Sequence, residues 1–264
     1  MRRSRKIIQW SFFILMFVVP VLNMMEIYFI KGTFISMDIG ELAVSDPLAV
    51  LQAVFASHEI KAVMLASITL PVVISLLLGR VWCSWACPYY LILDGFEALR
   101  KKLKLKPLKP AYNSNIPTKA NFVRYLLLIV GFIIVGIAGI PLLYLISPPS
   151  IISSQVVMFV KYLTITAEFI FIPIVLIFEF FFFYRFWCRY FCPTGTVLSF
   201  FKSKRGMRIQ YSGSCSSCGR CVKVCPMVLD PRQDGNSSQC HNCGECVASC
   251  PDNKKTDTLK FKIK

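Results

Sequence analysis

Long apolar runs alternate with short polar and basic segments over most of this chain. A helix that crosses a bilayer needs about 20 mostly apolar residues. Four runs approach or exceed that length, and they predict four transmembrane helices at Ile7–Ile30, Ala62–Gly79, Phe122–Ile146 and Thr164–Phe186. The fourth run is interrupted by Glu179, so its ends are defined less sharply than those of the others.

Basic residues gather on one side of these predicted spans. Four precede the first run and seven lie in the loop Tyr89–Asn121, whereas the loops Lys31–Lys61 and Ser147–Leu163 together carry three. The positive-inside rule therefore places the N-terminus, the middle loop and the C-terminus in the cytoplasm. Pro88–Leu105 has apolar residues at helical spacing followed by basic ones, which predicts an amphipathic helix lying on anionic lipid.

Composition agrees with a membrane class. The chain has 264 residues, of which 55% are hydrophobic, and a mean hydropathy of +0.58, values that exclude an ordinary soluble domain. The net charge of +16 could indicate a nucleic-acid partner, but membrane topology already accounts for it, and no nucleic acid is expected.

Eight of the twelve cysteines form two runs near the C-terminus, each spaced Cys-x2-Cys-x2-Cys-x3-Cys-Pro. This spacing holds a cubane iron–sulfur cluster, and in two-cluster ferredoxins the fourth cysteine of each run ligates the other cluster. Paired Cys-x2-Cys units can also bind zinc, but the third cysteine, the Cys-Pro ending and the tandem repeat favour iron–sulfur. We expect two [4Fe–4S] clusters, one held by Cys215, Cys218, Cys221 and Cys250, the other by Cys240, Cys243, Cys246 and Cys225.

The composition turns polar from Arg208 onward. The predicted fold is therefore an α-helical membrane domain of four transmembrane helices over residues 1–207, followed by a small cytoplasmic α+β ferredoxin-like domain over residues 208–264.

The other four cysteines form two Cys-x3-Cys-Pro pairs, Cys83/Cys87 and Cys188/Cys192, each after an apolar run. The predicted topology puts both pairs on the cytoplasmic face. Proline suits the first turn of a following helix, whose N-terminus stabilises anionic sulfur. The four thiols could hold a further metal centre, form a redox disulfide pair, or pack as small apolar residues. The matched units also suggest an internal duplication.

Together, Cys-Ser-Trp-Ala-Cys-Pro at 83–88, Cys-Arg-Tyr-Phe-Cys-Pro at 188–193 and the tandem cysteine tail resemble the NapH family, polytopic iron–sulfur subunits of periplasmic nitrate reductase systems. The run from Ser45-Asp46-Pro47 to His58 and Ile146-Ser147-Pro148 resemble it too. MauN-like, NosR-like and CcoG-like proteins share the cysteine motifs. The resemblance implies a bacterial inner-membrane protein that takes electrons from menaquinol or ubiquinol in the quinone pool. It would pass them through a NapG-type iron–sulfur partner toward a periplasmic nitrate reductase.

Quinol oxidation also needs a proton acceptor near a membrane face. The candidates are His58, because histidine titrates near neutral pH, and Asp46 in the same loop. Both could instead be ordinary loop residues that cap helices, since Asp46-Pro47 is typical of a helix start. The second histidine, His241, lies inside a cysteine run, where we expect it exposed or beside a cluster.

The sequence thus predicts an electron-transfer subunit of a quinol dehydrogenase; whether it is itself an enzyme is left open. The alternative is a redox-sensing or maturation factor for a respiratory or periplasmic oxidoreductase. No Cys-x-x-Cys-His haem attachment motif occurs.

Overall fold

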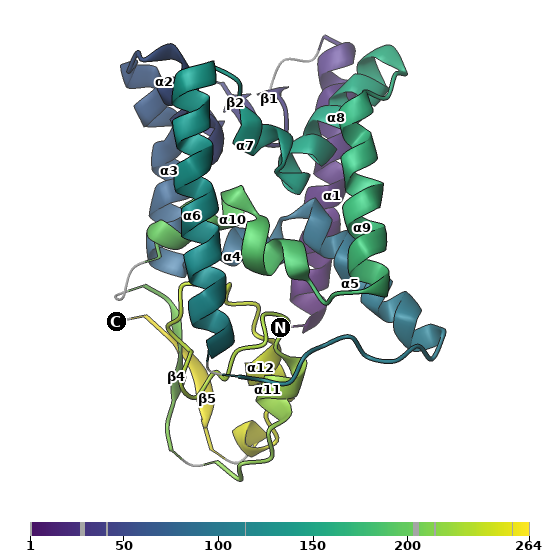
Figure 1. Cartoon of the computed structure of the whole chain (residues 1–264), viewed down its shortest axis with the longest axis vertical. Coiled ribbons are helices and arrows are strands. Elements are labelled where there is room, and N and C mark those ends of the chain that lie inside the picture. Colours follow the sequence, from purple (N-terminus) through teal and green to yellow (C-terminus); the bar gives the residue numbers. More distant parts are fainter. Residues whose placement is uncertain are drawn as a thin grey trace.

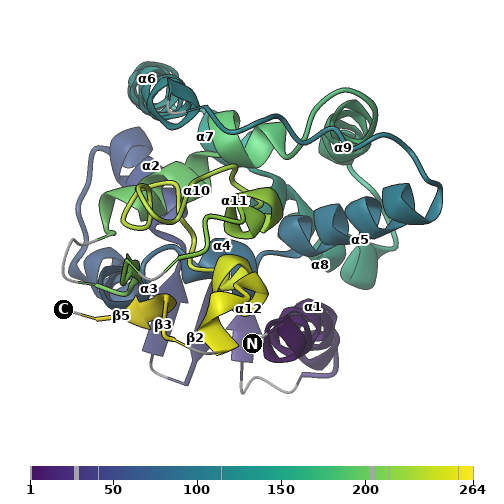
Figure 2. The same ribbon diagram turned by 90° about the horizontal axis from the view of Figure 1, so that it is seen from below.

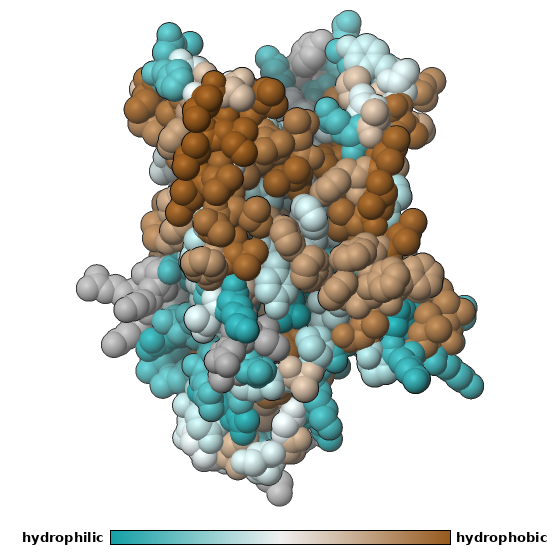
Figure 3. Space-filling model, viewed as in Figure 1, coloured by the Kyte–Doolittle hydropathy of each residue, from teal (hydrophilic) through white to brown (hydrophobic). Residues whose placement is uncertain are grey.

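The protein has a helical part and a small C-terminal module stacked along its long axis (Figure 1). The computed structural model describes residues 2–26, 30–40, 42–113, 115–202, 206–213, 215–254 and 256–263. The surface of the helical part seen in Figure 3 is mostly apolar, whereas that of the module is mostly polar. Seen from the module (Figure 2), helices at the periphery of the helical part include α1 (Arg2–Met24), α3 (Ala62–Leu78), α6 (Asn115–Ala138) and α9 (Phe171–Phe181).

Within the residues that the structure describes, two helices are long and apolar enough to cross a membrane, Arg2–Met24 and Pro117–Ala138. Of the predicted first span, residues 27–29 lie outside the described residues, and α1 ends at Met24. The predicted second span agrees with α3 to within one residue at its end. These helices place the chain in association with a membrane.

Two predicted boundaries are wrong. The third apolar run does not stay helical to Ile146, because α6 ends at Ala138, Gly139 takes a left-handed conformation (φ +68°) and Pro141 follows. A short helix, α7 (Leu142–Leu145), comes next. The fourth run is not one helix over Thr164–Phe186, because a 3₁₀ turn, η1 (Ala167–Ile170), leads into α9, which ends at Phe181.

The order of helices repeats, as the paired cysteine motifs suggested. The first half contains α1, α2 (Pro47–Ser57), α3, α4 (Val81–Trp85) and α5 (Pro88–Lys102). The second contains α6, α7, α8 (Pro148–Tyr162), η1, α9, a π-helical turn η2 (Trp187–Phe191) and α10 (Pro193–Phe200). The halves interlock, since α2 packs on α6 and α10 of the second half, whereas α8 packs on α1 and α5 of the first.

A three-stranded antiparallel sheet connects α1 to α2. Its strands are β1 (Ile30–Gly32), β2 (Ser36–Ile39) and β3 (Leu42–Ser45). Ser36 pairs with Ser45, and their hydroxyl oxygens are 3.0 Å apart. The last strand, β3, ends at Ser45, and the next residue, Asp46, is the N-cap of α2.

The C-terminal module pairs strands β4 (Arg208–Tyr211) and β5 (Leu259–Lys262) antiparallel. Between them lie α11 (Arg220–Val224), α12 (Glu245–Ser249) and the 3₁₀ turn η3 (Asp252–Lys254). Gly219 and Gly244 precede the two helices with φ of +66° and +76°, a conformation that glycine adopts without steric cost. The module is an α+β ferredoxin-type unit, as the cysteine spacing predicted.

Gly206 lies where the chain enters the module and passes tightly over the end of α3. A Cβ there would lie 2.3 Å from the carbonyl oxygen of Leu76, and the next residue, Met207, donates its N–H to Leu77 at 2.7 Å. Gly206→Ala should therefore destabilise the protein by about 1–3 kcal/mol through overpacking. Gly95→Ala is the matched control, because nothing lies within 4 Å of its Cβ position, and it should be neutral or stabilising by up to about 1 kcal/mol. Thermal unfolding in detergent measures both, and equal melting temperatures would contradict the close approach.

Candidate metal centres

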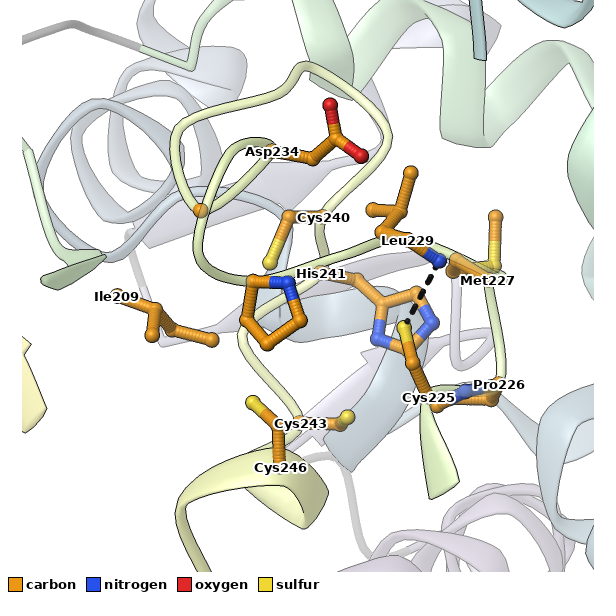
Figure 4. Close-up of a pocket in the computed structure, with 12 residues that line it drawn as sticks. Ile209, Cys225, Pro226, Met227, Leu229, Asp234, Cys240, His241, Cys243 and Cys246 are labelled. Carbon is orange, nitrogen blue, oxygen red and sulfur yellow. Dashed lines mark hydrogen bonds between the residues drawn. The ribbon is translucent and has the colours of Figure 1, made fainter. Parts of the chain in front are cut away.

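One apolar cavity in the C-terminal module is surrounded by thiols from both cysteine runs (Figure 4). Three thiols come from the second run and its α12 helix, whereas Cys225 comes from the end of the first run. The remaining lining is largely apolar and includes Ile209, Pro226, Met227 and Leu229. The structure thus brings together the exchanged set that the sequence predicted for one cluster: Cys225, Cys240, Cys243 and Cys246.

The spacing of these thiols fits a cluster better than a single ion. Zinc–sulfur bonds are about 2.3 Å long, so four zinc ligands must crowd one point. In the described part of the chain, no three Cys, His, Asp or Glu side chains gather closely enough to hold one metal ion. Thiols that stand around a hollow can instead bind the larger core of a cubane.

The cavity makes thiolates costly unless a metal is bound. Burial raises the pKa of Cys225 to about 11, and burial together with the neighbouring Cys225 and Cys240 thiols raises the pKa of Cys243 to about 12. The N–H of Leu229 offsets part of this cost, since it lies 3.4 Å from the Cys225 sulfur. Coordination to a metal removes the thiol proton outright, so these residues would hold a cluster as thiolates.

The other predicted set is arranged around α11. Cys221 is buried on α11 and belongs to the same small core as Cys246, with Cys250 packed against it. Cys215 and Cys221 are near enough for Cys215 to help raise the pKa of Cys221, after burial and Asp230. Cys218 is exposed. Ligation of one cluster by Cys215, Cys218, Cys221 and Cys250 stays a prediction.

The remaining four cysteines lie where the two halves of the helical part meet the module. Cys83 is on α4 and Cys188 on η2, whereas Cys87 and Cys192 are the N-caps of α5 and α10. Arg80 connects the two units, because it contacts one residue group in each. Its Nη2 is 3.9 Å from the Cys83 sulfur and also packs on Gly195, three residues after Cys192.

Glu179 connects the same two units on their other side. Its carboxylate accepts a hydrogen bond from the Tyr89 hydroxyl at 3.1 Å and another from the Trp187 N–H at 2.5 Å. Tyr89 lies two residues after Cys87, and Trp187 immediately precedes Cys188. The structure therefore gathers all four sequence-predicted thiols into one region.

Residues around Cys83 also dock the second cysteine run. The Ser84 hydroxyl donates to the His241 carbonyl at 2.7 Å, and the Trp85 indole donates to the Asn242 carbonyl at 3.3 Å. His241 is only 3% exposed and lines the cavity, so it lies beside the predicted cluster and not on the surface. Burial and the positive charge of nearby arginines lower the pKa of His241 well below its usual value, which keeps the ring neutral.

The two predicted proton acceptors are not brought together. Asp46 caps α2, accepting from the Leu48 N–H at 3.2 Å, whereas His58 is exposed at the other end of the same 11-residue helix, about 16 Å away. Both therefore serve as helix caps, and α2 lies in the part of the molecule remote from the module (Figure 1). Burial raises the pKa of Asp46 to about 6.

Sequence reasoning missed a charged groove of about 770 Å³ between α1, α5, the end of α9 and the module. Arg5 and Arg185 line it, and both side chains are almost fully buried and paired with Asp94. Their guanidinium groups lie 5.7 Å and 4.3 Å from the ring centre of Tyr90, which packs edge-on against His241. No local motif marks these residues, because each pairing joins positions more than 80 residues apart.

Comparison with known proteins bears on these centres. A family described as "4Fe-4S binding domain" matches residues 61–106 and again residues 165–210, and one described as "4Fe-4S dicluster domain" matches residues 196–262. The ferredoxin-type protein NapH of Escherichia coli is 28% identical over 185 residues, which cover 69% of this chain and 60% of the relative. The methylamine utilization ferredoxin-type protein MauN of Methylobacillus flagellatus is 26% identical over 194 residues, covering 72% and 64%.

These matches make the chain a ferredoxin-type 4Fe-4S protein similar to NapH and MauN. An uncharacterized protein of Methanocaldococcus jannaschii is 30% identical over 172 residues, covering 63% of this chain and 66% of the relative. The chain thus spans 56–66% of the length of the first three relatives it matches. No solved structure matches. The repeated domain falls on both Cys-x3-Cys-Pro units, which supports the duplication within this NapH/MauN-type chain.

Proposed function

We propose that this iron–sulfur electron-transfer protein is the membrane subunit of a quinol dehydrogenase. It would span the inner membrane four times with both termini in the cytoplasm, hold two [4Fe–4S] clusters in its C-terminal module, and serve a periplasmic nitrate reductase through a NapG-type partner. The observation that carries the proposal is a direct contact between the helical part and the module. Residues of the first Cys-x3-Cys-Pro unit and the preceding Arg80 donate hydrogen bonds to the loop that carries Cys240 and Cys243. Electrons that reach the first Cys-x3-Cys-Pro unit would therefore have a direct route into the module.

The arrangement of the ends supports the proposed topology. Arg2 and Arg5 at the start of α1 form ion pairs with Glu245 of the module at 2.7 and 2.8 Å. The N-terminus and the C-terminal module therefore lie at the same end of the molecule, as an even number of crossings requires. Basic residues of α1 and α5 gather at this end, which fits a cytoplasmic face.

Anaerobic mixing of the purified protein with menaquinol or ubiquinol tests the function. We expect quinol to reduce the iron–sulfur clusters, measured by bleaching of their visible absorption and by EPR. Dithionite reduction is the control for cluster integrity. If dithionite reduces the clusters but neither quinol does, the quinol role would be contradicted and the electron-transfer assignment would remain.

Asp46 is the proposed proton acceptor of the quinol reaction, and its raised pKa gives the pH dependence. A base must be ionised to accept a proton, so quinol-driven cluster reduction should speed up as pH rises through about 6. Asp46→Asn should slow it about 10²–10⁴-fold and abolish that inflection. The amide still caps α2, so protein yield should be unchanged, and Asp46→Ala serves as the capless comparison. An Asn variant with the wild-type pH profile would remove Asp46 from the mechanism.

Similarity to MauN supports a second candidate function for this chain. The MauN relatives are 25–26% identical to this chain and the NapH relatives 23–28%, so nitrate reduction is not singled out. The chain would then be a redox-sensing or maturation factor for another oxidoreductase. Depleting the protein after the reductase has been assembled separates the two. A maturation factor is then dispensable, whereas an electron-transfer subunit is needed at every turnover.

A further inference from the structure

Two arginine side chains are buried beside the four thiols of the Cys-x3-Cys-Pro units. Arg80 and Arg124 are each only 2% exposed. Arg80 approaches the Cys83 sulfur and also donates to the Ser238 carbonyl at 3.0 Å. Arg124 donates to the Thr196 hydroxyl at 3.2 Å and to the Gly195 carbonyl at 3.0 Å, just after Cys192.

Neither guanidinium has a counterion among the described residues, where no carboxylate lies within ion-pair distance of either. Both retain buried nitrogens without a hydrogen-bond partner, Arg80 Nε and Arg124 Nη1. An unpaired buried charge is strongly unfavourable. Two such charges side by side require an anion at the place they face, and that place is occupied by thiols.

The thiols themselves are arranged as ligands. Backbone N–H groups of Tyr89 and Tyr90 stabilise the Cys87 sulfur, and that of Gly195 stabilises the Cys192 sulfur. The same Cys-Pro arrangement occurs at Cys225, where N–H groups of the following residues reach the sulfur that lines the module's cavity. Hydrogen bonds to sulfur are a general means of tuning iron–sulfur clusters.

Charge selects among the possible states of this site. Two disulfides, or four thiols packed as apolar residues, would be neutral and would leave both arginines uncompensated. A single ion needs ligands gathered at one point, which the described residues do not provide. A cubane in its oxidised state with four thiolate ligands is a dianion, and two guanidinium groups neutralise it.

We propose that Cys83, Cys87, Cys188 and Cys192 ligate a third [4Fe–4S] cluster, shared between the two halves of the helical part, and that Arg80 and Arg124 are its counterions. The assignment deepens the proposed electron-transfer function and does not depend on quinol. Because Arg80 bonds to both Cys83 and Ser238, the third centre adjoins the module's second cysteine run. The two arginines raise the reduction potential of the centre by favouring its more negative, reduced state.

Iron and sulfide content of the anaerobically purified full-length protein tests the ligands. We expect iron for three cubanes per chain in the wild type and for two in the Cys87→Ser/Cys192→Ser double variant, with the EPR signals of the module unchanged. Cys225→Ser is the comparison that removes a cluster from the module instead. Iron for two cubanes in the wild type, with zinc or disulfides accounting for the other thiols, would overturn the proposal.

Redox titration tests the counterions. Arg80→Gln and Arg124→Gln should each shift the oxidised-to-reduced ratio of the third centre at least tenfold toward oxidised at fixed potential, a lowering of about 59 mV for one electron. Arg80→Lys and Arg124→Lys keep the positive charge and should recover part of the shift in reduction potential. They also test the counterion role if a Gln variant fails to bind the third cluster. Arg100→Gln, which removes an arginine bonded to carbonyl oxygens of Phe180 and Lys106, is the control. Fully loaded Gln variants with unchanged potential would contradict the counterion role.

Discussion

A Cys225→Ser variant should lose the [4Fe–4S] cluster of the second cysteine run, although Cys225 belongs to the first. The reason is geometric: Cys225 faces the cavity lined by Cys240, Cys243 and Cys246. The N–H of Leu229 is directed at its sulfur, so the position is organised to hold a thiolate. Serine is a poor ligand for iron in place of cysteine, and the cluster would lose one of four attachments.

Iron analysis and EPR of the dithionite-reduced protein measure this loss. Cys250→Ser is the matched comparison, since it removes the last cysteine of the second run and should eliminate the first-run cluster instead. The magnetic coupling between two neighbouring reduced clusters should vanish in both variants. If Cys225→Ser instead removed the first-run cluster and Cys250→Ser the second, ligands would not be exchanged and the predicted sets would be wrong.

The ferredoxin module could be predicted from the sequence because its signal is local. Each loop wraps its own three cysteines, and the left-handed Gly219 and Gly244 recur at the same place in both. For the two Cys-x3-Cys-Pro units, the sequence predicted only that both lie on the same face of the membrane, not that they contact each other. Their contact depends on two side chains. Glu179 binds Trp187 and Tyr89, which are 8 and 90 residues away, and Arg80 binds Cys83 and Ser238, which are 3 and 158 residues away.

The errors have a tertiary origin as well. Hydropathy extended the fourth span to Phe186, but Glu179 turns inward to hold Tyr89 and Trp187, and Arg185 takes a left-handed conformation (φ +46°) that redirects the chain. The predicted topology assigns Asp46 and His58 to one loop, whereas helix α2 separates them. A hydropathy window averages over side chains and cannot register which one turns toward a partner.

The interlocked halves explain why four thiols can meet at all. Each half ends its second apolar segment in a Cys-x3-Cys-Pro unit and starts a new helix from it, α5 or α10. Because α2 of the first half packs on α10 and α8 of the second packs on α5, each half fixes the position of the other's cysteine unit. Duplication thus supplies two pairs of cysteines, and the packing of each half against the other brings the two pairs together.

Arg185→Met should be among the most destabilising single substitutions in the helical part. The Arg185 side chain is 4% exposed, pairs with Asp94 and lies 3.4 Å from a Glu97 carboxylate oxygen, with its guanidinium over the Tyr90 ring. Removing one partner of a buried ion pair leaves the other uncompensated, which costs about 3–5 kcal/mol. Arg5 cannot replace it, because its own contact with Asp94 is long, 3.5 Å, and it is already paired with Glu245.

Thermal unfolding in detergent, with cluster absorption as a second signal, measures the loss. Lys101→Met is the surface comparison, since Lys101 pairs with Glu97 at 3.0 Å but is 76% exposed, and it should cost at most about 1 kcal/mol. Adding Asp94→Leu to Arg185→Met should recover stability, because an apolar pair can replace a buried ion pair. Equal melting temperatures for Arg185→Met and Lys101→Met would show that water reaches the groove and screens this pair.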